Sequence, residues 1–298
     1  MDALPNLDDP NLYREDKSGL YKDLAKLPGD YPRPSEGYPA PYGVIGLGES
    51  WWPAELLRSR LPDTLARGTT FVLAGGFGLG RLEGLLTAAR AESQRVVVLG
   101  PGTEAEVKLP AHPLAPYRYL RFVLDAIGEG ALGEAVDRAL AAELAALRPE
   151  VPTENNPAKL LAWGLIERVP LWVASDRYPM LPQALQQVFA RIGKSLSIAP
   201  PPGALEFFIT ALEARHEQGD PLTALVLGDD AYTRLAEEVL KTRVAEVEKI
   251  EPQGAEGPIP EALALWYRLA WTAYYLALLY KKDPGDHAVL TKLREAAE

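Results

Sequence analysis

Two glycine-rich turns carry the residues whose types and spacing best suit ligand chemistry. They are Gly46-Leu47-Gly48-Glu49-Ser50 and Gly75-Gly76-Phe77-Gly78-Leu79-Gly80. Each follows a short apolar run and precedes an amphipathic one, which predicts a turn between a strand and a helix. Glycine lets a ligand approach the backbone closely, and the N–H groups at a helix N-terminus attract anions. The turns therefore predict a phosphate site, with tight packing of strand on helix as the structural alternative.

Other motifs for catalysis, nucleotides and metals are not found in the sequence. The first turn lacks the third glycine of a dinucleotide fingerprint, and the second lacks an acidic residue about 20 residues later. Neither turn contains the Gly-Lys-Ser/Thr of a P-loop, and no Gly-x-Ser-x-Gly segment is present. Asp229-Asp230 is a pair of carboxylates for which a turn or a helix N-cap is the expected role. Cysteine is absent and His112, His216 and His287 are widely separated, so we expect no metal and no cofactor.

Short apolar runs alternate with amphipathic runs along most of the chain. The runs that predict strands are 42–45, 69–74, 95–99, 169–174, 196–199, 222–227 and 244–250. The runs that predict helices are 12–27, 51–60, 81–92, 120–147 with an interruption near 128–130, 183–191, 204–216 and 231–242. This alternation is typical of βαβ units, so we expect an α/β fold with parallel sheets. The polar, proline-containing segment 148–152 predicts a boundary between two domains, 1–150 and 151–298.

Length, charge and composition narrow the possible functions. The chain has 298 residues, 47% of them hydrophobic, which is enough for two domains with their own cores. The net charge of −10 argues against a nucleic-acid partner, and no targeting segment is evident at the N-terminus, so we expect a cytoplasmic protein. Residues 262–280 contain six aromatic residues and one charge, Arg268, which favours a buried helix over a membrane span. Asn, Gln, Met and Cys are scarce, which favours a thermophilic source.

Several segments together resemble a known family. They are the two glycine turns, Asn156-Pro157-Ala158-Lys159, Arg168-Val169-Pro170, and Tyr275 to Tyr280 followed by Asp283-Pro284. Over nearly the whole chain, the sequence is similar to the archaeal and bacterial bifunctional phosphoglucose/phosphomannose isomerases. The resemblance implies two sugar isomerase (SIS) domains, each a five-stranded parallel sheet flanked by helices in an αβα sandwich. It also implies a homodimer that binds a sugar phosphate or a related small anion and interconverts an aldose phosphate and fructose 6-phosphate through a cis-enediol.

The phosphate turns depart from the family pattern. The resemblance assigns phosphate binding to the residues Gly46, Gly48, Glu49, Ser50, Gly75, Gly76, Gly78 and Gly80. Glu49 replaces a glycine of the family's Gly-x-Gly-Gly-Ser, and its carboxylate would repel phosphate unless it points away. The second turn has no hydroxyl where the family has a Ser-Tyr-Ser-Gly-Asn-Thr-type sequence. Losing two or three hydrogen bonds to a charged group is expected to weaken phosphate binding by several orders of magnitude.

The catalytic positions of the family are also changed. The family's Glu corresponds to Arg191 and its Lys to Arg294. An arginine can stabilise an enediolate, but it cannot shuttle protons at neutral pH. The family's Arg has loose counterparts in Arg118 and Arg121, which follow Pro116.

Two further residues are candidate replacements for the missing groups. Glu206 falls near the family's catalytic His and is a candidate base, and His216 is a candidate for opening the sugar ring. In the alternative, Glu206 is an acid in the first turn of a helix and His216 lies near the end of that helix. We therefore expect a divergent isomerase-like protein with weak, altered or lost activity. A non-catalytic phosphosugar sensor and a dimeric scaffold that binds no small molecule are the alternatives.

Overall fold

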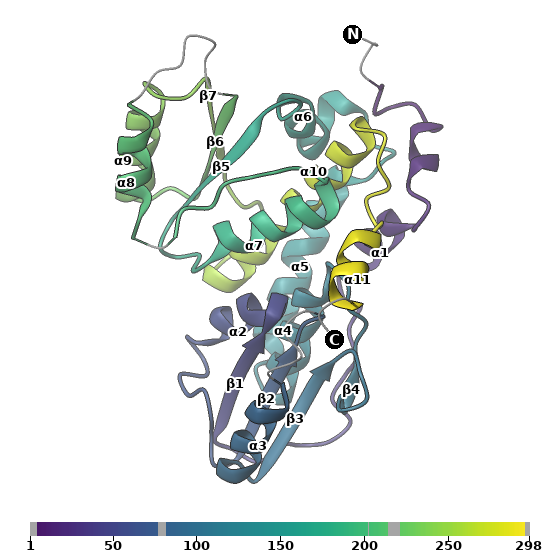
Figure 1. The fold of residues 1–298 in the computed structure, drawn as a ribbon, viewed down its shortest axis with the longest axis vertical. Helices are drawn as coiled ribbons and strands as arrows, with labels where there is room; N and C mark the ends of the chain where they lie inside the picture. Colours follow the sequence, from purple (N-terminus) through teal and green to yellow (C-terminus); the bar gives the residue numbers. More distant parts are fainter. Residues whose placement is uncertain (1–4, 77–81, 202, 214–220, 296–298) are drawn as a thin grey trace. The chain divides into compact units, whose positions relative to one another are not determined.

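The structure, a computed structural model, describes residues 5–76, 82–201, 203–213 and 221–295. The chain divides into two compact units that interleave in sequence (Figure 1). One unit combines Met1–Ala25 with Arg138–Asp286, and the other combines Lys26–Asp137 with His287–Glu298. The division into domains 1–150 and 151–298 stays a prediction.

The unit formed by Lys26–Asp137 and His287–Glu298 contains a parallel sheet in the order β1-β2-β3-β4. Its strands are β1 (Tyr42–Leu47), β2 (Thr69–Ala74), β3 (Arg95–Gly100) and β4 (Val107–Lys108). Its helical segments are η2 (Gly48–Ser50), α2 (Trp51–Leu57), α3 (Leu82–Glu92), α4 (Ala115–Ala126) and α11 (Ala288–Glu295). Every residue of β2 is buried, as expected for an interior parallel strand with helices against the sheet. One side of the core joins Val72 and Val98 to Leu82 and Leu86 of α3.

The other unit contains the second parallel sheet, in the order β5-β6-β7. Its strands are β5 (Val169–Ala174), β6 (Leu222–Leu227) and β7 (Glu246–Ile250). Its helical segments are η1 (Leu12–Glu15), most of α1 (Leu20–Lys26), the second half of α5 (Gly130–Leu147), η4 (Thr153–Asn155), α6 (Pro157–Gly164), α7 (Leu181–Val188), the π-helical turn η5 (Phe189–Gly193), α8 (Leu205–Ala211), α9 (Ala231–Leu240) and α10 (Pro258–Leu279). Leu171 and Val226 of the sheet pack with Leu205 of α8 and Leu240 of α9.

The expected number of strands is corrected by the structure. Within the described residues the sheets have four and three strands instead of five each. The predicted strand 196–199 makes a single bridge, between Leu171 and Ile198, and Pro200 and Pro201 follow it. Proline has no N–H to donate, so the ladder cannot continue along this segment.

The N-terminal segment 12–27, predicted as one helix, is divided in the structure. The turn η1 ends at Glu15, and α1 begins only at Leu20, after Gly19 with φ +73°. The Asp16 carboxylate accepts hydrogen bonds from the N–H groups of Leu20 and Tyr21, at 2.9 and 3.0 Å. A side chain that bonds the first free N–H groups starts a new helix, which explains the break.

The aromatic helix α10 forms the centre of its unit, as the buried-helix interpretation predicted. Its residues are buried from Ile259 to Leu279, and α6, α7 and η5 pack against it. Arg268 lies inside the helix, paired with Glu143 of α5 at 2.6 Å. Among the helices that the structure describes, none has the length and apolar character that a membrane crossing requires.

Candidate functional site

The two glycine turns lie side by side because they follow neighbouring parallel strands. Leu47 at the end of β1 is in register with Ala74 at the end of β2, and the Gly75 N–H donates to the Leu47 carbonyl at 3.0 Å. The structure therefore brings together the predicted residues Gly46, Gly48, Glu49, Ser50, Gly75 and Gly76. The predicted residues Gly78 and Gly80 lie outside the described residues.

Close packing accounts for three of these glycines. A Cβ atom on Gly46 would lie 2.4 Å from the Ser50 carbonyl oxygen, a backbone atom. A Cβ on Gly75 would lie 2.8 Å from both the Leu47 carbonyl oxygen and Glu49 Cγ, and one on Gly76 would lie 2.7 Å from Ala111 Cβ. The structural alternative, tight packing of strand on helix, is realised at Gly46, where a Cβ would also meet Trp51 Cα at the start of α2. Gly75 and Gly76 are instead packed against the first turn and Ala111.

Glu49 points onto the second turn. Its Oε1 accepts a hydrogen bond from the Gly76 N–H at 3.2 Å. In this position the side chain places a negative charge beside the carboxyl end of β2, next to a backbone donor that an anionic ligand would use. The neighbouring Ser50 hydroxyl is fully buried, with no hydrogen-bond partner among the described residues.

The arginines of α4 are bound to acidic side chains of their own unit. Arg118 Nη2 pairs with Asp30 at 2.7 Å, and its Nε donates to the Asp30 carbonyl at 3.3 Å. Arg121 is buried, with Nε 3.0 Å from Asp137 and Nη1 3.1 Å from Asp125. Both guanidinium groups are therefore engaged within the protein, and the catalytic role of Arg118 stays a prediction.

The other predicted catalytic residues are distributed over both units. Glu206 lies in the first turn of α8 and is exposed, as the helix-acid alternative describes. The backbone of Arg294 belongs to α11, and His216 lies outside the described residues. Arg191 lies in η5, where its carbonyl accepts a hydrogen bond from Lys194 Nζ at 2.6 Å. The roles proposed for Glu206, His216 and Arg294 stay predictions.

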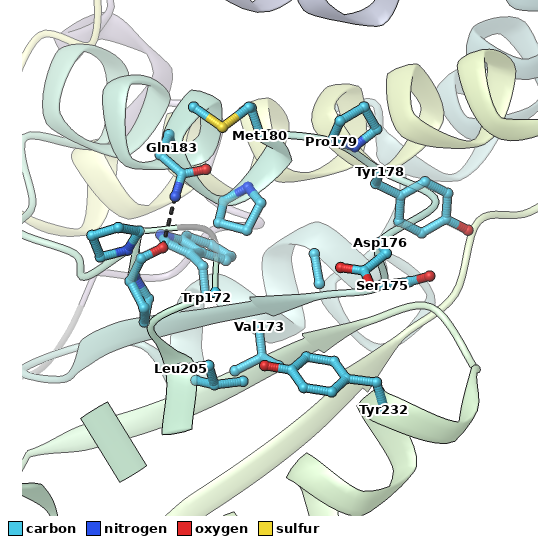
Figure 2. A pocket seen from close by; sticks show the side chains of 15 residues that line it. Trp172, Val173, Ser175, Asp176, Tyr178, Pro179, Met180, Gln183, Leu205 and Tyr232 are labelled. Atoms are coloured by element: carbon cyan, nitrogen blue, oxygen red, sulfur yellow. Dashed lines mark hydrogen bonds between the residues drawn. The ribbon is translucent and has the colours of Figure 1, made fainter. Parts of the chain in front are cut away.

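A cavity that the sequence did not indicate lies at the carboxyl end of β5 (Figure 2). Its volume is about 250 Å³. It is lined by Trp172, Val173, Ala174, Ser175, Asp176, Tyr178, Pro179, Met180, Pro182, Gln183, Pro200, Pro201, Gly203, Leu205 and Tyr232. In open α/β sheets this edge is where ligands usually bind.

One end of the cavity is held by hydrogen bonds between the two strand ends. The Ser175 hydroxyl, just after β5, donates to the Asp230 carboxylate, just after β6. Asp230 is also the N-cap of α9, accepting from the Thr233 N–H at 2.8 Å, which confirms the expected role of the Asp229-Asp230 pair. Burial acts to raise the pKa of Asp230, but these hydrogen bonds hold it below its ordinary value. Asp230 is therefore a structural carboxylate.

The charge of the predicted site residue Glu206 affects Tyr232, which lines the cavity. Burial raises the pKa of Tyr232, and the charges of Glu206 and Asp176 raise it further. Across the described residues, no cluster of three His, Asp or Glu side chains is arranged to hold a metal ion.

Comparison with known proteins gives the family. Residues 20–128 match the phosphoglucose isomerase N-terminal domain, and residues 154–296 match the bacterial phospho-glucose isomerase C-terminal SIS domain. A glucose-6-phosphate isomerase like protein from Thermus thermophilus is 46% identical, with 98% of this chain and 99% of that chain covered and a TM-score of 0.90. The chain belongs to the bacterial phosphoglucose isomerase family.

Solved structures of much lower sequence identity share the fold. A glucose-6-phosphate isomerase from Chlamydia trachomatis is 12% identical, covering 96% of this chain and 73% of its own, with a TM-score of 0.57. A glucosamine-6-phosphate deaminase from Thermotoga maritima is 11% identical, covering 94% and 96%, with a TM-score of 0.55. At these identities the likeness shows the fold alone. Among curated proteins no match was found. The predicted resemblance and the α/β fold of SIS domains are confirmed.

Proposed function

We propose that this chain is a divergent phosphoglucose isomerase-like protein that binds a carbohydrate derivative and has lost ordinary aldose–ketose isomerisation of hexose 6-phosphates. The observation that carries the proposal is the hydrogen bond from Gly76 to the Glu49 carboxylate. Gly76 belongs to the second glycine turn, where the family binds phosphate, and here its N–H is bonded to a carboxylate of the protein itself.

Electrostatics sets the size of this effect. Two unit charges of the same sign repel by about 4 kcal/mol at 4 Å when the effective dielectric constant is about 20. That corresponds to roughly three orders of magnitude in affinity. A phosphate beside Glu49 must therefore displace the carboxylate or overcome this repulsion, and it also competes for the Gly76 N–H.

The sequence supports the loss of turnover as well. Aldose–ketose isomerisation needs a base that moves a proton between C1 and C2. The position that carries the family's Glu is Arg191 here, and the family's Lys is Arg294. Neither guanidinium can accept a proton at neutral pH.

Isothermal titration with glucose 6-phosphate, together with a coupled isomerase assay, tests the proposal. The Glu49→Gln variant removes the charge. Glu55→Gln on α2 is the control, because Glu55 is a partly exposed acid paired with Arg58. We expect weak binding by the native chain, binding tighter by about 10-fold or more in Glu49→Gln, and no change in Glu55→Gln. Turnover by the native chain at an ordinary rate of about 1–1,000 s⁻¹ would refute the proposal. Unchanged affinity in Glu49→Gln would show that Glu49 does not exclude phosphate.

The phosphosugar sensor and the dimeric scaffold are the alternative functions. A sensor would bind phosphosugars without turnover, whereas a scaffold would bind none in the same titration. The homodimer that the resemblance implies, and a cytoplasmic location, are part of the proposal, and light scattering of the purified chain tests the dimer. The 46% identical relative from Thermus thermophilus supports the expected thermophilic source.

A further inference from the structure

Two side chains that line the cavity beyond β5 carry buried hydrogen-bonding atoms without a partner among the described residues. Trp172 is 1% exposed, and its Nε1–H has no acceptor within the described parts of the chain. Gln183 donates from Nε2 to the Pro200 carbonyl at 2.7 Å, while its Oε1 is buried without a donor among the described residues. Figure 2 shows both side chains at the same end of the cavity. Leaving a buried donor and a buried acceptor unpaired is costly, and a ligand that supplies both partners removes that cost.

We propose that this cavity is a binding site for a small uncharged polyol of monosaccharide size. A hydroxyl group both accepts and donates a hydrogen bond, so hydroxyls can serve Trp172 Nε1 and Gln183 Oε1 together. The inference rests on the proposed function for the class of ligand. It deepens that function by placing the carbohydrate in the cavity beyond β5.

The walls of the cavity suit the apolar faces of such a ligand. They are formed by prolines and by aromatic and aliphatic side chains, among them Pro179, Pro182, Met180 and Tyr232. Small-molecule sites are commonly lined in this way, with a few polar groups fixing the orientation. The volume of about 250 Å³ is just below the usual range for ligand pockets, about 300–1,000 Å³. A cavity of this size fits one sugar ring better than a nucleotide.

The charges around the cavity disfavour a phosphorylated ligand. Asp176 lines the cavity. Burial raises the pKa of Tyr232, and the negative charge of Glu206 raises it further. Lys, Arg and His do not occur among the described lining residues. The nearby Arg177 is paired with Glu261 at 3.0 Å. An anion would therefore meet acidic groups without a compensating cation, whereas an uncharged polyol meets no such penalty.

Titration calorimetry with glucose, mannose, fructose and glucitol, and with glucose 6-phosphate, tests the inference. Trp172→Phe removes the N–H while keeping the aromatic contact with Phe189, whose ring centroid lies 4.8 Å away. Gln183→Met removes the amide. The controls are Trp271→Phe, a buried tryptophan of α10, and Gln187→Met on the same helix as Gln183. Circular dichroism establishes that each variant is folded.

The expected result is that at least one neutral sugar or glucitol binds more tightly than glucose 6-phosphate. Each cavity variant should weaken that binding by about 2- to 12-fold, as for the loss of one hydrogen bond, and neither control should change it. The inference fails if no neutral compound binds at concentrations up to about 50 mM. It also fails if both cavity variants bind the neutral compound as tightly as the native chain does. A third refuting result is glucose 6-phosphate binding more tightly than every neutral compound and losing that affinity in Trp172→Phe. The proposed function fails separately, by ordinary isomerase turnover in the coupled assay.

Discussion

The buried ion pair between Arg268 of α10 and Glu143 of α5 allows a quantitative prediction about stability. Arg268 Nε lies 2.8 Å from Glu143 Oε2 and Nη2 lies 2.6 Å from Oε1, and both side chains are less than a tenth exposed. The Gln253 N–H also donates to Glu143 Oε1, at 3.1 Å. The substitution Arg268→Met keeps much of the apolar volume but leaves the carboxylate buried without its cation, with the Gln253 amide as a remaining donor.

We expect Arg268→Met to cost about 3–5 kcal/mol, because removing one partner of a buried pair leaves an uncompensated charge. For a unit of this size, such a loss lowers the melting temperature by roughly 6–20 °C. The double variant Arg268→Met/Glu143→Leu should recover most of the loss, since a well-packed apolar pair is often as stable as the ion pair or more stable. The exposed pair of Arg90 and Glu104, 3.2 Å apart, is the control, and Arg90→Met should cost less than about 1 kcal/mol.

Urea unfolding, with hydrogen exchange of the α10 amides, measures these changes in the unit that contains the pair. Hydrogen exchange is included because a chain with two compact units need not unfold in one step. The reasoning is refuted if Arg268→Met costs no more than Arg90→Met. It is also refuted if the double variant loses the sum of the two single losses, because the charges would then be uncoupled.

Two further predictions concern stability at single positions. Gly133→Ala should destabilise the chain by about 1–3 kcal/mol in thermal unfolding, because the new Cβ would lie 1.5 Å from Arg121 Nη1. Gly84→Ala on α3, with nothing within 4 Å, should instead stabilise it by about 0.4–1 kcal/mol, and equal effects at both sites would contradict this explanation. Asp230→Ala should cost about 1 kcal/mol at neutral pH through loss of the cap on Thr233. The pKa of Asp230 in the folded protein is lowered from 3.8, so this contribution is present above about pH 4 and should disappear as the pH falls further. Urea unfolding of the native chain and of Asp230→Ala, at neutral and at acidic pH, measures it.

The fold was predictable where the strands are fully buried. Parallel strands with helices on their faces are apolar along their length, so runs such as 69–74 and 222–227 are recognised without ambiguity. The strand β4 has only two residues, Val107 and Lys108, which is too short for a periodic signal. The segment 196–199 has strand-like residues, but the prolines after it restrict pairing to one bridge.

The site was predictable only in part. Turns that follow neighbouring parallel strands must meet, so the sequence indicated that Gly46 and Gly75 belong to one place. The direction of the Glu49 side chain depends on tertiary packing, and no local pattern encodes it. The cavity was missed because its lining comes from several separate segments, and because Trp172 and the prolines are ordinary core residues in sequence. Its available signal was Ser175 after one strand and Asp230 after the next.

The described charges of the protein bear on the proposed change of ligand from a phosphorylated to a neutral carbohydrate. In the unit with the glycine turns, Glu49 occupies a backbone donor, and Arg118 and Arg121 are paired with carboxylates. The Glu49 carboxylate and both arginines are thus engaged internally. In the other unit, the unused atoms of Trp172 and Gln183 are uncharged. Burying an anion without a compensating cation is costly, so a site whose unused polar groups are neutral and whose neighbouring charges are acidic disfavours anions. This combination favours binding of a neutral carbohydrate over a phosphorylated one. Titrations with glucose and with glucose 6-phosphate compare the two affinities directly.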